Sequence, residues 1–433
     1  MIDIRLIREQ PDFVRENIRK RQHPEYLDYF EELLKSDKKW RELLTKLNEL
    51  RAERNKISLD IAKLKKEKKD ASKLMKEAEK IPQKIKEIEE ETKSLEEKNR
   101  LLLLKIPNII DDSVPLGKDE SENVEIRKWG KEPKFNFPPK NHLEILQEHG
   151  MVDEERAAKA AGHGFFYFKK DLVLLDLAIQ QFALHFLKKK DFVVVEPPFM
   201  IKRKAYEGVV DLADFESVMY KVEGEDLYLI ATSEHAIGAM MMDEVLDKKD
   251  LPMKFAGVSP CFRKEVGTHG KYTKGLFRMH QFNKVEQFVF CLPEQSPKML
   301  EEIQKNAEEL YQQLGLHYRV VELCSGDMSI LKNKSYDTEI WMADGNFREI
   351  GSATNCTDYQ ARRLNVKFRE GPGKPPVAFV HTLNNTALAT SRTMLAILEQ
   401  FQQKDGSVLI PKVLQPFMNG MTKIEKAEKK KRD

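Results

Sequence analysis

The stretch 261–291 holds the densest group of side chains suited to chemistry in this chain of 433 residues. Two runs with strand character, 262–265 and 277–286, flank a glycine-rich polar loop, which predicts a long β-hairpin. Side chains alternate between the two faces of a strand, so the polar residues of each run share one face. On that face we expect Arg263 and Glu265 from the first run and Arg278, Phe282, Lys284 and Glu286 from the second.

These residue types suit a nucleotide. A guanidinium group binds phosphate oxygens bidentately, an aromatic ring stacks on a base, and a carboxylate accepts a hydrogen bond from an amine. The chain has no GxGxxG and no GxxxxGK[ST] motif, so neither a Rossmann fingerprint nor a P-loop is available to hold a nucleotide. The alternative is a solvent-facing sheet surface whose alternating charges only form ion pairs.

Two short segments elsewhere add polar groups. The segment 232–234 reads Thr-Ser-Glu and follows an extended run, 227–230, so it also fits the N-cap of a helix. The segment 349–352 reads Glu-Ile-Gly-Ser and offers a carboxylate and a hydroxyl. Oxygen ligands are those that Mg²⁺ prefers, and magnesium commonly takes only one or two carboxylates.

Two heptad arrays lie in the first quarter of the chain, and their four- and three-residue steps put one stripe along each of two helices. A polar connection, 65–72, separates them, so we expect an antiparallel hairpin that brings Leu64 near Leu74 and Leu50 near Ile88. Arms of about 40 residues would reach about 60 Å. The arrays are Leu43, Leu47, Leu50, Arg54, Ile57, Ile61 and Leu64, then Leu74, Ala78, Ile81, Ile85, Ile88, Thr92, Leu95, Asn99 and Leu102.

Prolines lie within the second array and just after it. Pro82 lies inside the second array, where it should bend the helix or mark a late helix start. Pro107, Pro115 and Gly117 indicate a linker, so we expect a helical arm over 1–112 and a second domain over 113–433. A coiled coil that only dimerises, with a solvated Lys-rich surface, is the alternative role for the arm.

Beyond the linker, short extended runs such as 192–196, 227–230 and 277–291 alternate with helices. This pattern predicts an α+β fold, in which helices flank an antiparallel β-sheet.

Composition restricts the environment and the partners. The chain has 74 Lys+Arg against 71 Asp+Glu, a net charge of +3, so any affinity for nucleic acid requires locally segregated charge. Its four cysteines form no CxxC pair, which disfavours a disulfide framework and a zinc ribbon, and no zinc is expected. No apolar stretch approaches the roughly 20 residues that span a bilayer, and the start lacks the apolar centre of a signal peptide. We therefore expect a cytoplasmic protein with no membrane partner.

The hairpin sequence carries a family resemblance. Phe262-Arg263-x-Glu265, a loop and Arg278-x-His280-Gln281-Phe282 resembles motif 2 of class II aminoacyl-tRNA synthetases, and its extension through Lys284-x-Glu286 is similar to the seryl members. The segment 232–234 resembles the TSE element of that family, 382–392 resembles motif 3, and 192–201 resembles motif 1, a dimer-interface element. The resemblance is strong over 232–392 and rests on architecture alone in the arm.

The resemblance implies an enzyme that activates L-serine with ATP and transfers it to the 3′ end of tRNA-Ser, with Arg263 and Arg392 in catalysis. It implies a serine site made of Thr232, Ser233, Glu234, Arg263, Glu286, Asn384 and Thr386. It implies an ATP site made of Arg263, Lys264, Glu265, Arg278, Met279, His280, Gln281, Phe282, Glu349, Ile350, Gly351, Ser352 and Arg392. Glu349 would hold Mg²⁺, with Ser352 nearby.

The resemblance also implies partners. The long variable arm of tRNA-Ser would bind the helical hairpin, and a second copy of the chain would complete a homodimer. The Lys-rich tail 423–432 is expected to be disordered or to add nonspecific phosphate contacts. Two alternatives stay open: a class II paralogue that makes an aminoacyl-adenylate for an acceptor other than tRNA, and a coiled-coil RNA-binding or scaffold protein without catalysis.

The sequence departs from the family pattern at three positions. Asn385 stands where glycine is usual, Ser391 replaces a usual glycine or proline, and Gly351 replaces a usual serine. The first two bear on the backbone geometry of motif 3, because asparagine adopts left-handed conformations less freely than glycine.

Overall fold

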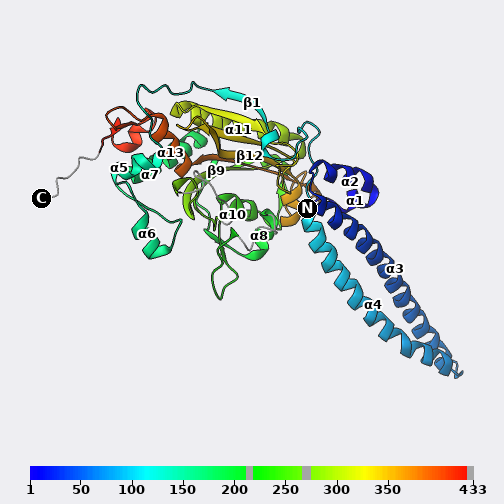
Figure 1. The fold of residues 1–433 in the computed structure, drawn as a ribbon. Coiled ribbons are helices and arrows are strands. Elements are labelled where there is room, and N and C mark those ends of the chain that lie inside the picture. The colour runs from blue at the N-terminus through cyan, green and yellow to red at the C-terminus, as the bar shows by residue number, and fades with distance from the viewer. Residues whose placement is uncertain (211–217, 266–274, 427–433) are drawn as a thin grey trace. The chain divides into compact units, whose positions relative to one another are not determined.

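The computed structural model describes residues 1–210, 218–265 and 275–426. The chain forms two compact units, Met1–Pro107 and Asn108–Asp433, both drawn in Figure 1. Gly267 and Gly270 of the predicted hairpin loop, and the Lys-rich tail from residue 427 onward, lie outside the described residues. The two compact units do not show which part binds tRNA and which part catalyses. The predicted division into an arm, 1–112, and a catalytic domain, 113–433, therefore stays a prediction.

The first unit, described throughout, contains the helices α1 (Ile4–Glu9), α2 (Pro11–Lys20), α3 (Pro24–Lys66) and α4 (Ser72–Lys105). A proline occupies the first turn of α2 and of α3, where its missing N–H is not needed. The long helices α3 and α4 form the predicted hairpin, which is confirmed (Figure 1). Pro82 lies inside α4, which begins at Ser72, so the alternative of a late helix start is wrong.

The heptad stripes of α3 and α4 face each other. Leu47 and Ile57 on α3 are buried against Ile81 and Ile85 on α4. Leu50, Ile61, Leu74, Ala78 and Ile88 pack around this cluster. An ion pair of 2.7 Å between Arg51 and Glu89 lies beside the predicted pair Leu50 and Ile88, as the expected register requires. Packing along an apolar stripe is what stabilises two helices that extend side by side.

The second unit is built on an eight-stranded sheet, in the order β1-β10-β11-β12-β15-β9-β8-β4. Neighbouring strands are antiparallel except for β4 and β8, which are parallel. The strands are β1 (Val124–Trp129), β10 (Tyr318–Glu322), β11 (Lys334–Trp341), β12 (Phe347–Thr357), β15 (His381–Ala389), β9 (Gln281–Cys291), β8 (Met253–Phe262) and β4 (Val193–Val195). The predicted α+β fold class is confirmed.

Helices cover both faces of this sheet. The helices are α5 (His142–His149), α6 (Glu154–Ala161), α7 (Asp171–Lys188), α8 (Arg203–Val209), α10 (Ser233–Met240), α11 (Ser296–Leu314), α12 (Tyr359–Leu364) and α13 (Thr390–Gln400). In one cluster α7, α11 and α13 pack against Val285 and Val289 of β9, whereas in a second α8, α10 and α12 pack against Phe288 and Phe290. Odd and even residues of a strand face opposite sides, so these are the two faces of one sheet (Figure 1).

Short strands complete the second unit. They form a sheet of β14 (Pro376–Phe379), β13 (Lys367–Arg369) and β7 (Val245–Asp247), and three pairs: β2 (Val152–Asp153) with β3 (Tyr167–Phe168), β5 (Met200–Ile201) with β6 (Tyr228–Leu229), and β16 (Val408–Leu409) with β17 (Lys423–Ile424).

The predicted hairpin exists, but its strands are shorter than expected. Strand β8 pairs with β9 from Met253 opposite Phe290 to Phe262 opposite Gln281. The expected extension of the first strand to Glu265 is wrong, since Glu265 has a φ of 47°. The expected start of the second strand at 277 is also wrong, because 275–277 form a 3₁₀ turn before β9. The residues at the open end of the hairpin are therefore placed by loop geometry and not by strand alternation.

Candidate active site

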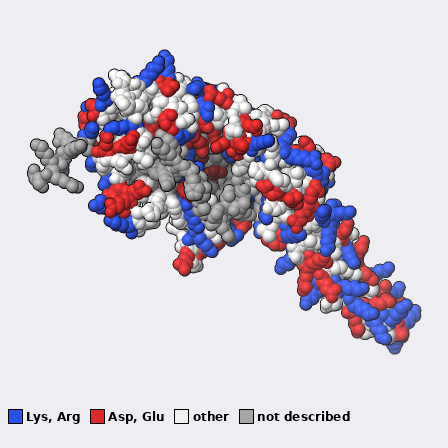
Figure 2. Space-filling view, in the orientation of Figure 1, with Lys and Arg blue, Asp and Glu red and all other residues white. Residues whose placement is uncertain are grey.

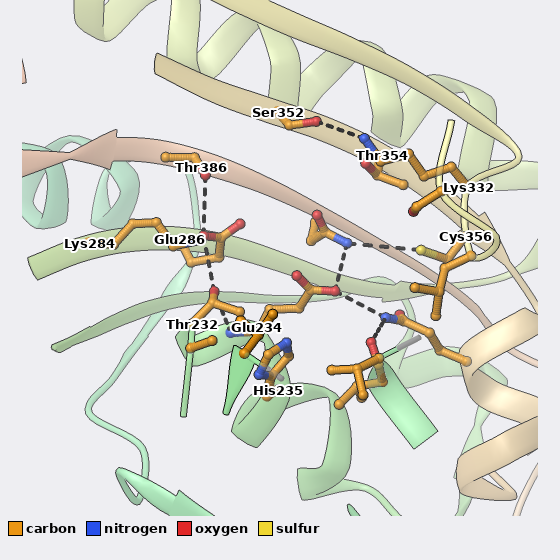
Figure 3. A pocket seen from close by; sticks show the side chains of 18 of the residues that line it. Thr232, Glu234, His235, Lys284, Glu286, Lys332, Ser352, Thr354, Cys356 and Thr386 are labelled. Carbon is orange, nitrogen blue, oxygen red and sulfur yellow. Dashed lines mark hydrogen bonds and ion pairs between the residues drawn. The ribbon is translucent and has the colours of Figure 1, made fainter. Parts of the chain in front are cut away.

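A cavity of about 450 Å³ opens on the face of the sheet that α10 covers (Figure 3). Its walls come from α10 and from the strands β9, β12 and β15. Of the predicted site residues, Thr232, Glu234, Arg263, Glu286, Glu349, Ser352, Asn384 and Thr386 line it. Segments that lie far apart in the sequence thus bring their polar side chains to one space.

The N-terminus of α10 lies directly on the sheet. Thr232 is the N-cap, and its Oγ1 accepts a hydrogen bond of 3.3 Å from the backbone N–H of Glu234. Gly257 on β8 permits this close approach, because a Cβ there would lie 2.6 Å from Ser233 Oγ and 2.5 Å from Ile237 Cδ1. The glycine therefore sets how deeply the start of α10 enters the cavity.

Glu286 is the most enclosed acid of the cavity. It lies opposite Thr386 in the pairing of β9 with β15, so the two side chains share a face. Thr386 Oγ1 and Thr232 Oγ1 each donate to Glu286 Oε2 at 3.4 Å, and Lys284 forms an ion pair with the same oxygen. The side chains of Lys284 and Glu286 are only 7% and 2% exposed. A charged acceptor flanked by two hydroxyls can hold a small hydroxylated ligand.

Glu234, on α10, provides a second acid in the same cavity. Its Oε1 accepts hydrogen bonds of 3.0 Å from Gln360 Nε2 and from Asn384 Nδ2. Burial and the negative charge of Glu286 raise the pKa of Glu234 to about 7, and the charge of Lys284 opposes them in part. A cationic amine in the cavity would compensate the burial of this carboxylate.

A smaller cavity of about 50 Å³ adjoins the first. The guanidinium of Arg263 lies 5.3 Å from the centroid of the Phe282 ring, and that of Arg392 lies 4.8 Å from the centroid of Phe277. Four residues line both cavities: Arg263, Lys284, Glu349 and Thr386. Glu265 joins the two arginines and the two rings around the smaller space. Cations beside aromatic rings suit the phosphates and the base of a nucleotide.

A β-bulge aligns the acid and the hydroxyl of β12. Glu349 lies opposite Glu339, whereas Ser352 lies opposite Asp337, so Ile350 is an extra residue in this strand. Asp337 and Glu339 are two residues apart and share a face, so the bulge puts Glu349 and Ser352 on one face as well. Without the bulge, residues three apart would point to opposite sides of the sheet.

Glu349 is held as a carboxylate by its neighbours. Arg392 Nη1 donates to the backbone oxygen of Glu349 at 2.9 Å and lies 3.4 Å from its Oε2. Burial acts to raise the pKa of Glu349, but the charges of Arg392 and Lys332 outweigh it, so the pKa lies below its usual value. Within 1–210, 218–265 and 275–426, no group of three or more His, Cys, Asp or Glu side chains could hold a metal ion.

Several predicted site residues are not part of either cavity wall. Neither cavity is lined by Ser233, Lys264, Arg278, His280 or Gln281. Ser233 Oγ instead donates to the backbone oxygen of Gly257 at 3.4 Å, and Arg278 Nη1 donates to Glu265 at 3.3 Å. Met279, Ile350 and Gly351 line the smaller cavity. The roles of all these residues stay predictions.

The cavity also contains residues that the motifs did not indicate. His235, Lys332, Thr354, Cys356 and Gln360 line it. Alternation along β12 was the available signal for Thr354 and Cys356, since they follow Ser352 at two-residue steps. Lys332 comes from a loop, where no periodic pattern marks it.

Two of the three departures from the family pattern have a structural setting. A Cβ at Gly351 would lie 3.1 Å from the Cβ of Thr386, so the glycine leaves room for that threonine. Asn385 lies within β15, and its Nδ2 donates to the backbone oxygen of Ile303 at 2.7 Å. Neither Asn385 nor Ser391 has a positive φ, so neither position needs the freedom of glycine.

Among the helices in the described part of the chain, none combines the length and the apolar character that crossing a membrane requires.

Comparison with known proteins decides the family. Residues 1–110 match the family model of the seryl-tRNA synthetase N-terminal domain, and residues 218–401 match that of the tRNA synthetase class II core domain (G, H, P, S and T). The chain is 55% identical over 422 residues to the serine–tRNA ligase of Methanocella arvoryzae, across 97% of this chain and 99% of that protein. This chain belongs to the seryl-tRNA synthetase family. The predicted resemblance is confirmed.

Solved structures agree with this assignment. The seryl-tRNA synthetase of Pyrococcus horikoshii, complexed with ATP, superposes with a TM-score of 0.94 at 47% identity and covers 99% of this chain and 100% of that one. The cytoplasmic serine–tRNA ligase of Naegleria fowleri, in complex with AMP, gives a TM-score of 0.88 at 34% identity, across 99% of both chains. The two cavities thus lie in the fold of an ATP-dependent class II synthetase.

Proposed function

We propose that this chain is a serine–tRNA ligase, which activates L-serine with ATP and transfers serine to the 3′ end of tRNA-Ser. Membership of the seryl-tRNA synthetase family supports the reaction. The single observation that carries the choice of amino acid is the buried carboxylate of Glu286 between the hydroxyls of Thr232 and Thr386. The Glu286 carboxylate can accept a hydrogen bond from the serine hydroxyl, and a threonine hydroxyl can donate one to its oxygen.

The remaining groups of the cavity fit the rest of the amino acid. The Glu234 carboxylate would bind the serine ammonium group, with Asn384 holding that carboxylate in place. Arg263 lines both cavities, so its guanidinium can contact the serine carboxylate and the α-phosphate of ATP together. Alanine would leave the acid and both hydroxyls of the triad unpaired, which a buried site penalises strongly.

The chemistry needs no covalent attachment to the enzyme. A serine carboxylate oxygen forms a bond to the α-phosphorus as the bond to the β-phosphate bridging oxygen breaks, and pyrophosphate leaves with the electron pair. A ribose hydroxyl of the tRNA then attacks the carbonyl carbon of seryl-adenylate, and AMP leaves. Arg263 and Arg392 stabilise negative charge around the phosphates, and the cavity walls hold the two reactants in contact.

The residues present fit a magnesium ion. Glu349 is a carboxylate with a lowered pKa, Ser352 presents a hydroxyl from the same face, and the buried Oδ1 of Asp337 beside them has no hydrogen-bond partner in the protein. Oxygen donors with few carboxylates are typical of Mg²⁺ in sites that bind nucleotide phosphates. We propose that Glu349 and Ser352 hold the ion that accompanies ATP, where it would neutralise phosphate charge.

The arm fits a nucleic-acid partner. Figure 2 shows Lys and Arg side chains gathered at the tip of the hairpin, where α3 meets α4. Exposed lysines at this tip are Lys63, Lys65, Lys66, Lys68, Lys69 and Lys73. Such a surface can bind the phosphates of an RNA by charge and shape without reading bases. We propose that the long variable arm of tRNA-Ser binds here.

An exposed apolar surface supports a homodimer. Leu177 on α7 is 48% exposed, and Val193 and Val194 on the edge strand β4 are 58% and 42% exposed. Met200 on β5 is 45% exposed. An edge strand with apolar neighbours is a surface that proteins normally cover, and this one includes the segment that resembles the dimer-interface motif. We further propose that the dimer works in the cytoplasm, where tRNA is charged.

The test is ATP–pyrophosphate exchange with each amino acid in turn, followed by aminoacylation of purified tRNA. We expect serine to stand far above all other amino acids and tRNA-Ser to accept it. Preference for a different amino acid would refute the proposed specificity. Exchange without any transfer to tRNA would favour the paralogue that serves another acceptor, and no exchange at all would favour a scaffold protein.

A further inference from the structure

Lys332 places an ammonium group on the wall of the larger cavity, beside the segment of β12 proposed to lie near the phosphates. It comes from the loop between β10 and β11, and its Nζ donates to Ser352 Oγ at 3.3 Å. Figure 3 shows Lys332 on the side of the cavity away from Lys284. The cavity therefore has an ammonium group on each of these sides: Lys284 forms an ion pair with Glu286, and Lys332 bonds to Ser352.

Hydrogen bonds hold the loop in place on both sides of Lys332. Asn108, which is 4% exposed, donates from Nδ2 to the backbone oxygen of Leu331 at 3.0 Å. The backbone N–H of Asn333 donates to the oxygen of Asn355 on β12 at 2.9 Å. These bonds hold the backbone of Lys332 against the sheet.

The charge of Lys332 acts on carboxyl groups from three elements. It lowers the pKa of Glu349 on β12, after the larger effect of Arg392. It also opposes the burial that raises the pKa of Asp337 on β11 and of Glu234 on α10. The ammonium of Lys332 therefore lies close enough to carboxyl groups of α10, β11 and β12 to act on all three.

The proposed reaction needs positive charge at this place. Two anions, the serine carboxylate and the ATP triphosphate, must meet in the cavity. The amino acid takes the side of Glu286 and Glu234, which leaves the phosphates on the side of Glu349 and Ser352. An ammonium has three donors, so Lys332 can keep its bond to Ser352 and still donate to a phosphate oxygen.

We propose that Lys332 binds a phosphate oxygen of ATP beyond the α-phosphate and retains it in the pyrophosphate that leaves. This inference rests on the proposed function and deepens it. As the α-phosphorus bonds to the serine carboxylate, the bond to the bridging oxygen breaks and the electron pair stays on pyrophosphate. Lys332 keeps its proton throughout and stabilises the added charge. Part of the affinity for ATP therefore persists without a divalent ion.

The experiment compares Lys332→Met and Lys332→Arg with a matched control, Lys334→Met. Lys334 lies two residues away, but its Nζ pairs with Glu322 at 3.0 Å and donates to Ser113 at 2.7 Å, and it lines neither cavity. Binding of ATP, AMP and inorganic pyrophosphate is measured calorimetrically in EDTA and with Mg²⁺. Pyrophosphate exchange gives KM for ATP and kcat, and thermal melts establish that each variant is folded.

We expect Lys332→Met to weaken ATP and pyrophosphate about 10- to 100-fold in EDTA, as the loss of a charge-assisted hydrogen bond predicts. AMP binding should stay within about twofold, and Lys332→Arg and Lys334→Met should resemble the unchanged protein. Equal losses for AMP and ATP would overturn the proposal, because they would indicate a structural role. A defect confined to transfer onto tRNA would overturn it too. If the unchanged protein binds neither ATP nor pyrophosphate, the proposed function itself fails.

Discussion

Replacing Glu286 by glutamine tests how the cavity selects its amino acid. The substitution keeps the shape of the side chain and removes its charge. Hydrogen bonds to charged groups contribute about 1.5–3 kcal/mol, so kcat/KM for serine should fall roughly 10- to 150-fold. Alanine has no hydroxyl and makes no such bond, so the preference for serine over alanine should fall by a similar factor.

Stability has to be separated from selectivity in this experiment. The Lys284 side chain is only 7% exposed and loses its ion-pair partner when Glu286 becomes neutral. Breaking a buried pair typically costs about 3–5 kcal/mol. The double variant Lys284→Met/Glu286→Gln removes the stranded charge, so it should recover much of the lost free energy of unfolding without recovering the serine preference.

The assay is ATP–pyrophosphate exchange with serine and with alanine, on variants whose thermal melts show that they are folded. Glu370→Gln is the control, because Glu370 forms an exposed ion pair with Lys248 and neither residue lines a cavity. A serine-to-alanine ratio that stays unchanged in both folded variants refutes the assignment of Glu286 to the hydroxyl. A ratio that falls in the single variant but returns in the double variant would show that the stranded lysine, and not the lost acceptor, caused the effect.

Three further predictions concern other parts of the molecule. Because the pKa of Glu234 is raised to about 7, its carboxylate forms as pH rises, so kcat/KM for serine should increase about tenfold from pH 6 to pH 8, and Glu234→Gln should abolish this dependence. Gly257→Ala forces a Cβ to 2.5 Å from Ile237 Cδ1, so we expect the free energy of unfolding to fall by about 1–3 kcal/mol and KM for serine to rise. Gly371→Ala, where a Cβ would meet open space, is the control and should change neither quantity. Ile85→Ala, at a position 6% exposed, should cost the arm about 2–5 kcal/mol, measured by hydrogen exchange, and reduce aminoacylation while serine activation continues.

The periodic parts of the fold could be predicted from the sequence. The heptad steps from Leu47 to Ile57 and from Ile81 to Ile85 specify which sides of two helices face each other, and the structure has that register. The alternation of Phe282, Lys284 and Glu286 likewise specified their common face, because β9 is regular from Gln281 onward. In both places a repeat in the sequence matches a repeat in the backbone.

The residues that were misplaced lie where the backbone leaves its repeat. Glu265 and Arg278, both predicted on the common strand face, lie after the end of β8 and before the start of β9, so strand alternation does not apply to them. His280, which also precedes β9, is held by distant residues: its backbone N–H donates to the oxygen of Gly164 at 2.9 Å, and its ring contacts Phe165 with centroids 5.1 Å apart. These partners lie more than a hundred residues away in the sequence, so no local sequence pattern predicts such a contact.

The bulge at Ile350 shows why composition alone could not have placed the acid and the hydroxyl of β12. Regular alternation would direct Glu349 and Ser352 to opposite faces, and only one extra residue in the pairing with β11 brings them together. The same strand also brings Thr354 and Cys356 to the cavity wall, and its pairing with β15 shifts again between Asn355 and Thr357. If this bulge is what brings Glu349 and Ser352 to one face, then deleting Ile350 should separate them. The protein would keep its sheet but lose ATP-dependent serine activation, whereas a substitution such as Ile350→Val, which keeps the count of residues, should preserve that activity.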